Sequence, residues 1–328
     1  MVEKLVEIRD LKVRFKTYKG VVKAIDIDKL DIYKGETLGL VGETGCGKSV
    51  TTEAILNIVP DPGEITNGEI IFEGEDLLKK SKKEWKDIRG KKIAKIFQNP
   101  MSNLNPVYRI KRQMVDIIKV HRDIKDKEAE EMALELLDKV RLSNPKAVLN
   151  SYPHELSGGM RQRVMIAMAL SSNPSLLIAD EPTTALDVTI QAQILKLIDN
   201  LKEEVGTTVL FITHDLGVIA QVAERVAVMY AGNIVEVADV VDIFENPFHP
   251  YTRGLIASIP DKASENEDLP VIKGTVPNLI DIEEGCRFYP RCDYHTPECK
   301  ESPPRLEEVK EGHEVACFNV DDVIGDDA

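Results

Sequence analysis

A glycine-rich stretch near the N-terminus has the residue types that bind phosphate groups. Residues 42–49 read Gly-Glu-Thr-Gly-Cys-Gly-Lys-Ser and follow the apolar run 37–41. Glycines let backbone N–H groups close around phosphate oxygens, a lysine neutralises the β- and γ-phosphates, and a serine hydroxyl binds Mg²⁺. The stretch therefore predicts a P-loop between a strand and a helix that begins near Val50.

A second candidate site follows another apolar run. Residues 176–181 read Leu-Leu-Ile-Ala-Asp-Glu. Asp180 has the chemistry to hold Mg²⁺, usually through water, and Glu181 has the chemistry to polarise a water that attacks a γ-phosphate. An acidic pair after a strand is by itself more often a helix N-cap. In a chain that also has a P-loop, the pair predicts hydrolysis of a nucleoside triphosphate.

The elements that must position these residues follow from the hydrophobic pattern. Alternating apolar residues over 11–30 predict short strands that lead into a buried strand. Apolar residues spaced by three and four predict a helical insertion over about 101–172. The runs 176–179 and 209–213 are separated by a helical pattern, which predicts a parallel sheet with functional groups at the carboxyl ends of its strands.

Two features describe the rest of the chain's organisation. Residues 226–230 and 234–237 flank a Gly-Asn turn, which predicts a hairpin. From Asn246 onward the sequence is Pro-rich and irregular, so we expect a domain over 1–244 and a loop-rich extension over 245–328. We expect that extension to pack separately from the P-loop.

Composition limits the possible partners and location. The formal charge of −14 and the pI of about 5.0 disfavour binding to nucleic acid, because phosphate contacts require an excess of Lys and Arg. The sequence has no apolar stretch of the roughly 18–20 residues that a membrane span needs, and its N-terminus does not resemble a signal peptide. We therefore expect a cytoplasmic chain that reaches a membrane only through a partner.

The cysteines are concentrated in the extension. Four of the five are Cys286, Cys292, Cys299 and Cys317, with the spacing C-x5-C-x6-C-x17-C. This spacing lacks the C-x2-C knuckle that is common in zinc ribbons. The clustering predicts a metal site, and iron–sulfur, zinc and free thiols remain the alternatives. Nearby histidines 295 and 313 are expected to have surface or structural roles.

Further motifs make the chain resemble the ABC ATPases. Residues 156–163, Leu-Ser-Gly-Gly-Met-Arg-Gln-Arg, resemble the ABC signature motif at the start of a helix. Gln98 corresponds to the Q-loop, residues 185–187 to the D-loop, and His214 to the switch histidine. The resemblance covers residues 1 to about 240. It implies a P-loop (RecA-like) α/β ATPase core with an N-terminal antiparallel β part and a helical signature subdomain.

The resemblance also implies roles for individual residues. Ser157 and the N–H groups of Gly158 and Gly159 would form a second anion site that closes over ATP held by another subunit, so hydrolysis would need a dimer. Adenine would stack on Tyr18, with Phe15 as the alternative. The residues expected at the chain's own nucleotide are Tyr18, Gly42, Glu43, Thr44, Gly45, Cys46, Gly47, Lys48, Ser49 and Val50. Those expected to act with Mg²⁺ or in catalysis are Ser49, Gln98, Asp180, Glu181 and His214, with Asp187 in the D-loop.

The extension narrows the resemblance to one branch. Residues 246–255, 274–279, 285–292 and 313–317 resemble the tail of oligopeptide and dipeptide importer ATPases. This implies a [4Fe–4S] cluster on the four tail cysteines, with Zn²⁺ as the alternative. It also implies a peripheral subunit at the cytoplasmic face of the membrane that hydrolyses ATP to power peptide import.

The partners implied are two transmembrane permeases, a second ABC ATPase that forms a heterodimer with this chain, and an extracytoplasmic substrate-binding protein. Importers of nickel or oligosaccharides are alternatives, as is a soluble ABC ATPase that does not act in transport.

Overall fold

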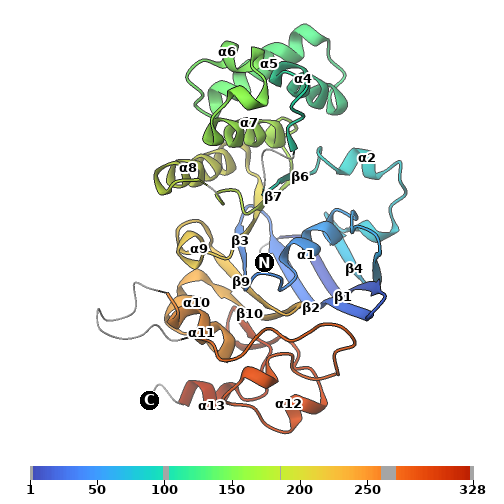
Figure 1. Cartoon of the computed structure of the whole chain (residues 1–328), viewed down its shortest axis with the longest axis vertical. Coiled ribbons are helices and arrows are strands. Elements are labelled where there is room, and N and C mark those ends of the chain that lie inside the picture. Colours follow the sequence, from blue (N-terminus) through green and yellow to red (C-terminus); the bar gives the residue numbers. More distant parts are fainter. Residues whose placement is uncertain (1–2, 99–102, 185, 260–270, 326–328) are drawn as a thin grey trace. The chain divides into compact units, whose positions relative to one another are not determined.

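The computed structural model describes residues 3–98, 103–184, 186–259 and 271–325 (Figure 1). It divides into two compact units, unit 1 comprising Met1–Lys79 with Thr213–Ala328, and unit 2 comprising Lys80–Ile212. The expected start of the helical insertion near 101 and residue 185 of the D-loop motif lie outside the described residues.

Unit 1 contains an antiparallel sheet, as the alternating pattern predicts. Its strand order is β2-β1-β4-β5. Leu11 and Val13 pair with Ile27 and Ile25 on the neighbouring strand, and all four side chains are buried. Burial of alternate residues fixes the register, because a slip by one residue would expose this apolar face. The strands are β1 (Lys4–Thr17), β2 (Gly20–Tyr33), β4 (Gly63–Phe72) and β5 (Glu75–Asp76).

The other strands of unit 1 follow the order β11-β12-β10-β9-β3. β3 runs parallel to β9, and β9 and β10 form the predicted hairpin around Gly232. A Cβ atom at Gly232, whose φ is 91°, would lie 2.3 Å from the carbonyl oxygen of Ala24, so only glycine fits there. The strands are β3 (Thr37–Val41), β9 (Arg225–Tyr230), β10 (Asn233–Asp239), β11 (Glu307–Lys310) and β12 (His313–Val315).

The helices of unit 1 are short, and half of those described belong to the extension. They are α1 (Lys48–Ile55), η1 (Leu77–Lys79), α9 (Leu216–Val222), α10 (Val240–Glu245), α11 (Pro250–Ala257), η4 (Tyr289–Arg291), α12 (Glu298–Glu301) and α13 (Val320–Gly325). β12 pairs with β10, so part of the extension continues the strand order of the unit that carries the P-loop.

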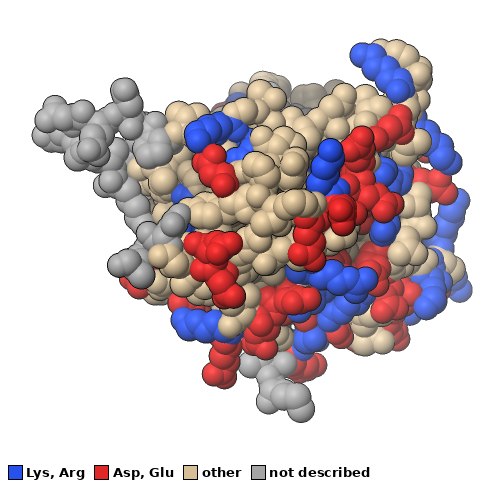
Figure 2. Space-filling model, turned by 90° about the horizontal axis from the view of Figure 1, so that it is seen from below, with Lys and Arg blue, Asp and Glu red and all other residues tan. Residues whose placement is uncertain are grey.

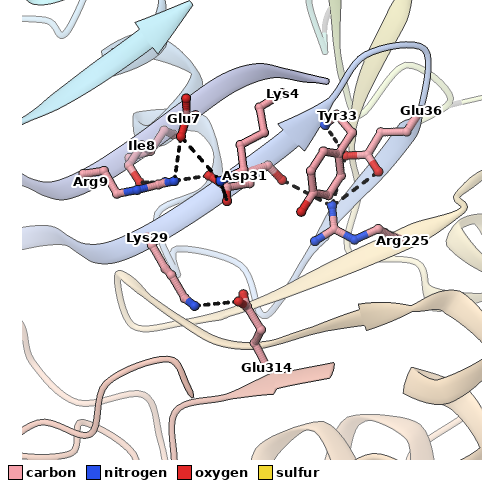
Figure 3. A network of polar contacts seen from close by, with 10 residues as sticks. All are labelled: Lys4, Glu7, Ile8, Arg9, Lys29, Asp31, Tyr33, Glu36, Arg225 and Glu314. Carbon is pink, nitrogen blue, oxygen red and sulfur yellow. Dashed lines mark hydrogen bonds and ion pairs between the residues drawn. The ribbon is translucent and has the colours of Figure 1, made fainter. Parts of the chain in front are cut away.

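Charged side chains link the two strand groups of unit 1 (Figure 3). Lys29 of β2 pairs with Glu314 of β12 at 2.5 Å, and this ion pair joins the two groups. Within the antiparallel sheet, Asp31 of β2 forms ion pairs with Arg9 and Lys4 of β1 at 2.6 and 2.8 Å. Burial alone would raise the pKa of Asp31, but the hydrogen bonds from Arg9 and Lys4 outweigh it and lower that pKa. The carboxylate is therefore ionised in the folded protein, and its pairing stabilises the fold until acid protonates it.

Unit 2 contains the predicted parallel strands. β7 pairs in parallel with both β6 and β8, and every residue of β7 and β8 is buried. A continuous apolar run of this kind is typical of a parallel strand that is covered on both faces. The strands are β6 (Ile93–Ile96), β7 (Leu176–Asp180) and β8 (Thr208–Ile212).

The helical part of unit 2 packs on α7 (Gly158–Leu170), whose start carries the signature motif (Figure 1). On α5, Ala129, Ala133 and Leu137 are buried at spacings of four, which places one apolar face against its neighbours. α5 contacts α4, α6 and α7. The helices of the unit are α2 (Trp85–Ile88), α4 (Ile110–His121), α5 (Asp126–Lys139), α6 (Pro145–Asn150), η2 (Pro153–Glu155), α7 (Gly158–Leu170) and α8 (Val188–Val205).

One face of the molecule shows how charged side chains are distributed. On the face in Figure 2, the acidic and basic side chains of the described residues are interspersed in small groups. In the part of the chain that the structure describes, no helix is both long and apolar enough to span a membrane.

A buried glutamate connects the extension to β10. The Glu236 carboxylate is fully buried and accepts hydrogen bonds from the N–H groups of Phe248 and His249 at 2.6 and 3.1 Å. Its Oε1 also lies 2.7 Å from Nε2 of His313, which is buried too. His313 therefore has the structural role that the sequence indicated.

Replacing His313 by alanine is expected to destabilise the protein by about 1–3 kcal/mol, because the buried Glu236 carboxylate loses one of its hydrogen-bond partners. Chemical denaturation followed by circular dichroism measures the change. The control is Glu307→Ala on exposed β11, for which we expect a change of less than about 0.5 kcal/mol. Equal stabilities of the two variants would contradict the assigned role.

Candidate functional site

The P-loop of unit 1 connects β3 to α1, as predicted. Gly42, Gly45 and Gly47 have φ angles of 151°, 83° and 113°, in the region that favours glycine. A Cβ at Gly42 would lie 2.0 Å from the carbonyl oxygen of Met229, whereas one at Gly45 would meet no atom within 4 Å. Gly42 is thus required by close packing, and Gly45 only by its backbone angle.

Lys48 lies beneath the loop and binds its carbonyl groups. The side chain is buried, and Nζ donates hydrogen bonds to the carbonyl oxygens of Gly42 at 2.6 Å and Glu43 at 3.1 Å. These contacts occupy carbonyl oxygens that would otherwise repel an anion at the loop. The lysine therefore places a positive charge directly beneath the loop.

The other expected residues of the loop differ in exposure. Thr44, Gly45 and Ser49 are exposed, so their polar groups are accessible to a ligand. Cys46 is buried, and burial raises the pKa of its thiol. Its side chain is thus enclosed beneath the loop, where the sulfur lies 3.7 Å from Nζ of Lys48. Glu43, Gly47 and Val50 are intermediate, and Val50 lies in the first turn of α1.

The two candidates for adenine stacking lie in different environments. Tyr18, in the turn between β1 and β2, is 94% exposed, and Nζ of Lys19 lies 5.6 Å from its ring centroid. Phe15 is half-buried, and its ring lies where a Cβ of Gly63 would be. Tyr18 is thus available to a ligand, while Phe15 packs against β4.

His214 lies in unit 1, two residues after the end of β8. Its side chain is exposed. The N–H group of the preceding residue, Thr213, donates a hydrogen bond to the carbonyl oxygen of Leu40 on β3 at 3.4 Å. The following residue, Asp215, is the N-cap of α9. His214 is therefore held beside the strand that leads into the P-loop.

In unit 2, the structure brings Glu181 and Gln98 together. Oε2 of Glu181 accepts hydrogen bonds from Nε2 of Gln98 at 2.6 Å and from the hydroxyl of Thr184 at 2.9 Å. Glu181 has a φ of 45°, which is strained for a residue with a side chain and is typical of functional sites. Its N–H group donates to the carbonyl oxygen of Ile212, which holds the strained backbone in place.

Asp180 has a partner that sequence reasoning missed. The carboxylate is buried at the end of β7 and forms an ion pair with Lys95 of β6 at 2.9 Å. A lysine within the otherwise apolar strand Ile93–Ile96 was the available signal, because a buried lysine needs a partner of opposite charge. Any Mg²⁺ held by Asp180 would share this carboxylate with Lys95.

The signature residues begin a helix, as predicted. Ser157 is the N-cap of α7, and its Oγ accepts a hydrogen bond from the N–H group of Met160 at 3.3 Å. Asp187 is in turn the N-cap of α8. A groove of about 590 Å³ lies between the two helix starts. Its lining includes Ser157, Gly158, Gly159, Asp187, Arg141 and Arg163.

The two arginines add positive charge to a groove that already has a helix N-terminus. Arg163 belongs to the signature stretch, and its guanidinium donates to the carbonyl oxygen of Val140 at 2.7 Å. Arg141 was missed, because it lies outside every motif and reaches the groove only through folding. The groove is therefore chemically suited to an anion.

The four tail cysteines line one small cavity, together with His249 and His295. Burial raises the pKa of Cys286 to about 12 and that of Cys292 to about 11, and it also raises the pKa of Cys317. Within the described ranges, no group of three or more His, Cys, Asp or Glu side chains is arranged to hold a metal ion. The predicted cysteines therefore line one cavity, but within the described residues they do not form a metal-binding group.

Comparison with known proteins identifies the family. The model of the "ABC transporter" family matches residues 25–184, and that of "Oligopeptide/dipeptide transporter, C-terminal region" matches residues 235–299. The oligopeptide transport ATP-binding protein OppD of Bacillus subtilis is 50% identical, over 96% of this chain and 88% of its own length. The chain belongs to the ATP-binding proteins of oligopeptide and dipeptide ABC transporters.

Other members of this family are similar over nearly the whole chain. A probable peptide ABC transporter ATP-binding protein of Sinorhizobium fredii, y4tR, is 49% identical over 98% of this chain and 96% of its own. The dipeptide transport ATP-binding protein DppD of Bacillus subtilis is 45% identical, over 96% of this chain and 95% of its own. The similarity of these ATP-binding proteins therefore includes the extension.

Solved structures support the ABC ATPase fold for the larger part of the chain. The dimeric bacterial ABC transporter cassette MJ0796 is 31% identical with a TM-score of 0.63, and the match covers 72% of this chain and 98% of that one. A post-hydrolysis dimer of the same cassette, bound to ADP and phosphate, gives 30% identity and a TM-score of 0.63 over the same shares.

Alanine substitutions at two loop glycines separate the two steric requirements of the P-loop. Gly42→Ala is expected to abolish ATP binding, because the new Cβ would overlap the Met229 carbonyl oxygen. Gly45→Ala adds only backbone strain, about 1–2 kcal/mol, so it should weaken binding without abolishing it. Isothermal titration with ATP measures both. Tighter binding by Gly42→Ala than by Gly45→Ala would contradict the loop packing.

Proposed function

We propose that the chain is the subunit that binds and hydrolyses ATP to power import of oligopeptides or dipeptides through an ABC transporter. The observation that carries this proposal is the combination of a P-loop supported by Lys48 with an extension of the peptide-transporter type in one chain. Family members named as peptide transport ATP-binding proteins support the substrate class.

The proposed chemistry assigns separate tasks to the two units. In unit 1, the P-loop N–H groups and Lys48 hold the phosphate chain, Ser49 binds Mg²⁺, and Tyr18 stacks on adenine. His214 is proposed to contact the γ-phosphate. In unit 2, Glu181 polarises the attacking water, while Asp180 and Gln98 act on Mg²⁺ and its waters. The hydrogen bond between Gln98 and Glu181 supports their acting together.

The proposed assembly follows from the signature groove. Ser157, Gly158 and Gly159 would contact ATP held by a second ATPase subunit, with Asp187 beside them. We propose a heterodimer of ATPases with two transmembrane permeases, supplied by an extracytoplasmic substrate-binding protein. The chain itself would be peripheral at the cytoplasmic face of the membrane. Closure of the ATPase dimer on ATP would then move the permeases.

We further propose that Cys286, Cys292, Cys299 and Cys317 hold a [4Fe–4S] cluster. Their shared cavity provides four thiol ligands, the donor set that such clusters use. A bound cluster would supply structural cross-links to an extension composed mainly of loops. His295, whose Nδ1 lies 2.6 Å from the carbonyl oxygen of Cys292, would orient that part of the loop.

Glu181→Gln is expected to slow ATP hydrolysis by at least about 100-fold in the assembled transporter while ATP binding is retained, because the carboxylate that polarises water is lost and the P-loop is unchanged. Phosphate release and isothermal titration measure the two properties. Glu203→Gln, an exposed change on α8 that removes the same charge, should hydrolyse ATP like the parent protein. Near-normal hydrolysis by Glu181→Gln would place the base elsewhere.

Protein purified without air from iron-replete cells is expected to be brown and to contain about four iron atoms per chain. Replacing Cys292 by serine should remove the colour, because one of the four ligands is lost. Elemental analysis and visible absorption provide the measurements. Colourless protein with one equivalent of zinc would overturn the cluster and leave the transport function intact.

A further inference from the structure

Arg291 of the extension reaches into the P-loop. It ends η4, and its side chain is 4% exposed. Nη1 and Nη2 donate to the two carboxylate oxygens of Glu43 at 2.9 and 3.2 Å, in the bidentate geometry of a strong ion pair. Nε donates to the carbonyl oxygen of Lys273 at 2.8 Å, and Nη1 to the hydroxyl of Tyr230 at 3.3 Å. The guanidinium is therefore held from several sides.

A second contact from the extension reaches the same loop residue. The N–H group of Glu43 donates a hydrogen bond to the hydroxyl of Tyr251 at 2.9 Å. Tyr251 is fully buried, with its ring centroid 4.6 Å from that of Tyr230 and 5.6 Å from that of Phe288. Both the backbone and the side chain of Glu43 are thus fixed by residues of the extension.

The charge of Glu43 gives this contact a consequence for ligand binding. Glu43 is the second residue of a loop whose proposed ligand, ATP, carries several negative charges. An unpaired carboxylate there would repel the phosphate groups, and it would also be free to turn toward the loop N–H groups. Hydrogen bonding to Glu43 raises the pKa of Arg291, so the guanidinium remains charged.

We propose that Arg291 is a positioning residue for ATP binding: it neutralises Glu43, holds that carboxylate away from the phosphate site, and fixes the second residue of the loop. The inference rests on the proposed function, because it assumes that the loop binds ATP. It assigns a role in nucleotide affinity to an extension that lies outside the match to the ABC transporter model.

The packing differs from the sequence expectation at this point. We expected the extension to pack separately from the P-loop, but both belong to unit 1, and Arg291 and Tyr251 contact the loop directly. Arg291 also immediately precedes Cys292. The same short segment therefore places a thiol in the cysteine cavity and a guanidinium on the loop. The domain division at 244/245 stays a prediction.

Arg291→Met is expected to weaken ATP binding at least about five-fold, a change at the lower end of the typical coupling between two binding sites. Arg291→Lys, which keeps the charge but loses the bidentate geometry, should fall between Arg291→Met and the parent protein. Glu43→Gln removes the carboxylate itself and gives the reference affinity for the double variant. The double variant Arg291→Met/Glu43→Gln should bind within about two-fold of Glu43→Gln, because no carboxylate remains to be neutralised.

Full-length variants are compared by isothermal titration with ATP, with circular dichroism and thermal unfolding as checks of folding. Lys273→Met is the matched control, because it removes an exposed positive charge from the extension without touching Glu43, and it should bind ATP like the parent. In the assembled transporter, Arg291→Met should raise the KM for ATP and change kcat much less, since Glu43 acts on binding and not on the attacking water.

Two results would overturn the inference. One is parent-like ATP binding by Arg291→Met. The other is a double variant that binds as weakly as Arg291→Met, since Arg291 would then act through packing of the extension and not through Glu43. Lys48→Ala tests the proposed function separately: undiminished ATP binding by that variant, or no binding by the parent protein, would contradict the P-loop assignment itself.

Discussion

A loop that binds a phosphate chain must present hydrogen-bond donors to its ligand, and its own acceptors must be occupied elsewhere. In this chain several of these acceptors have partners within unit 1. Lys48 donates hydrogen bonds to the carbonyl oxygens of Gly42 and Glu43, and the N–H group of Gly232 donates one to the carbonyl oxygen of Cys46. Arg291 pairs with the Glu43 carboxylate. The rest of unit 1 positions these partners around the loop, because unpaired acceptors there would oppose anion binding.

In unit 2, one carboxylate is held on a backbone of unfavourable conformation. The left-handed backbone of Glu181 costs of order 1–3 kcal/mol and persists because its N–H group and its side chain are both bonded. The neighbouring Asp180 is fixed by Lys95. The two acidic residues thus have separate partners, which fits separate roles for them.

The extension gains its order from contacts with the rest of unit 1. Glu236 binds the start of α11 and His313, β12 pairs with β10, and the aromatic side chains of Tyr230, Tyr251 and Phe288 pack together. These contacts are polar or aromatic and involve few aliphatic side chains. An extension of this kind is held by specific contacts more than by an apolar core of its own.

The sequence by itself determined the P-loop, the buried strands, the acidic pair at a strand end and the family resemblance. These features are local: positive φ angles require glycine, and strand and helix periods are read over a few residues. The tertiary structure decided which side chains meet. Gln98 and Glu181 are 83 positions apart, and Glu43 and Arg291 are 248 positions apart. Local patterns carry no information on such distances, because only the packing of the folded chain brings those residues together.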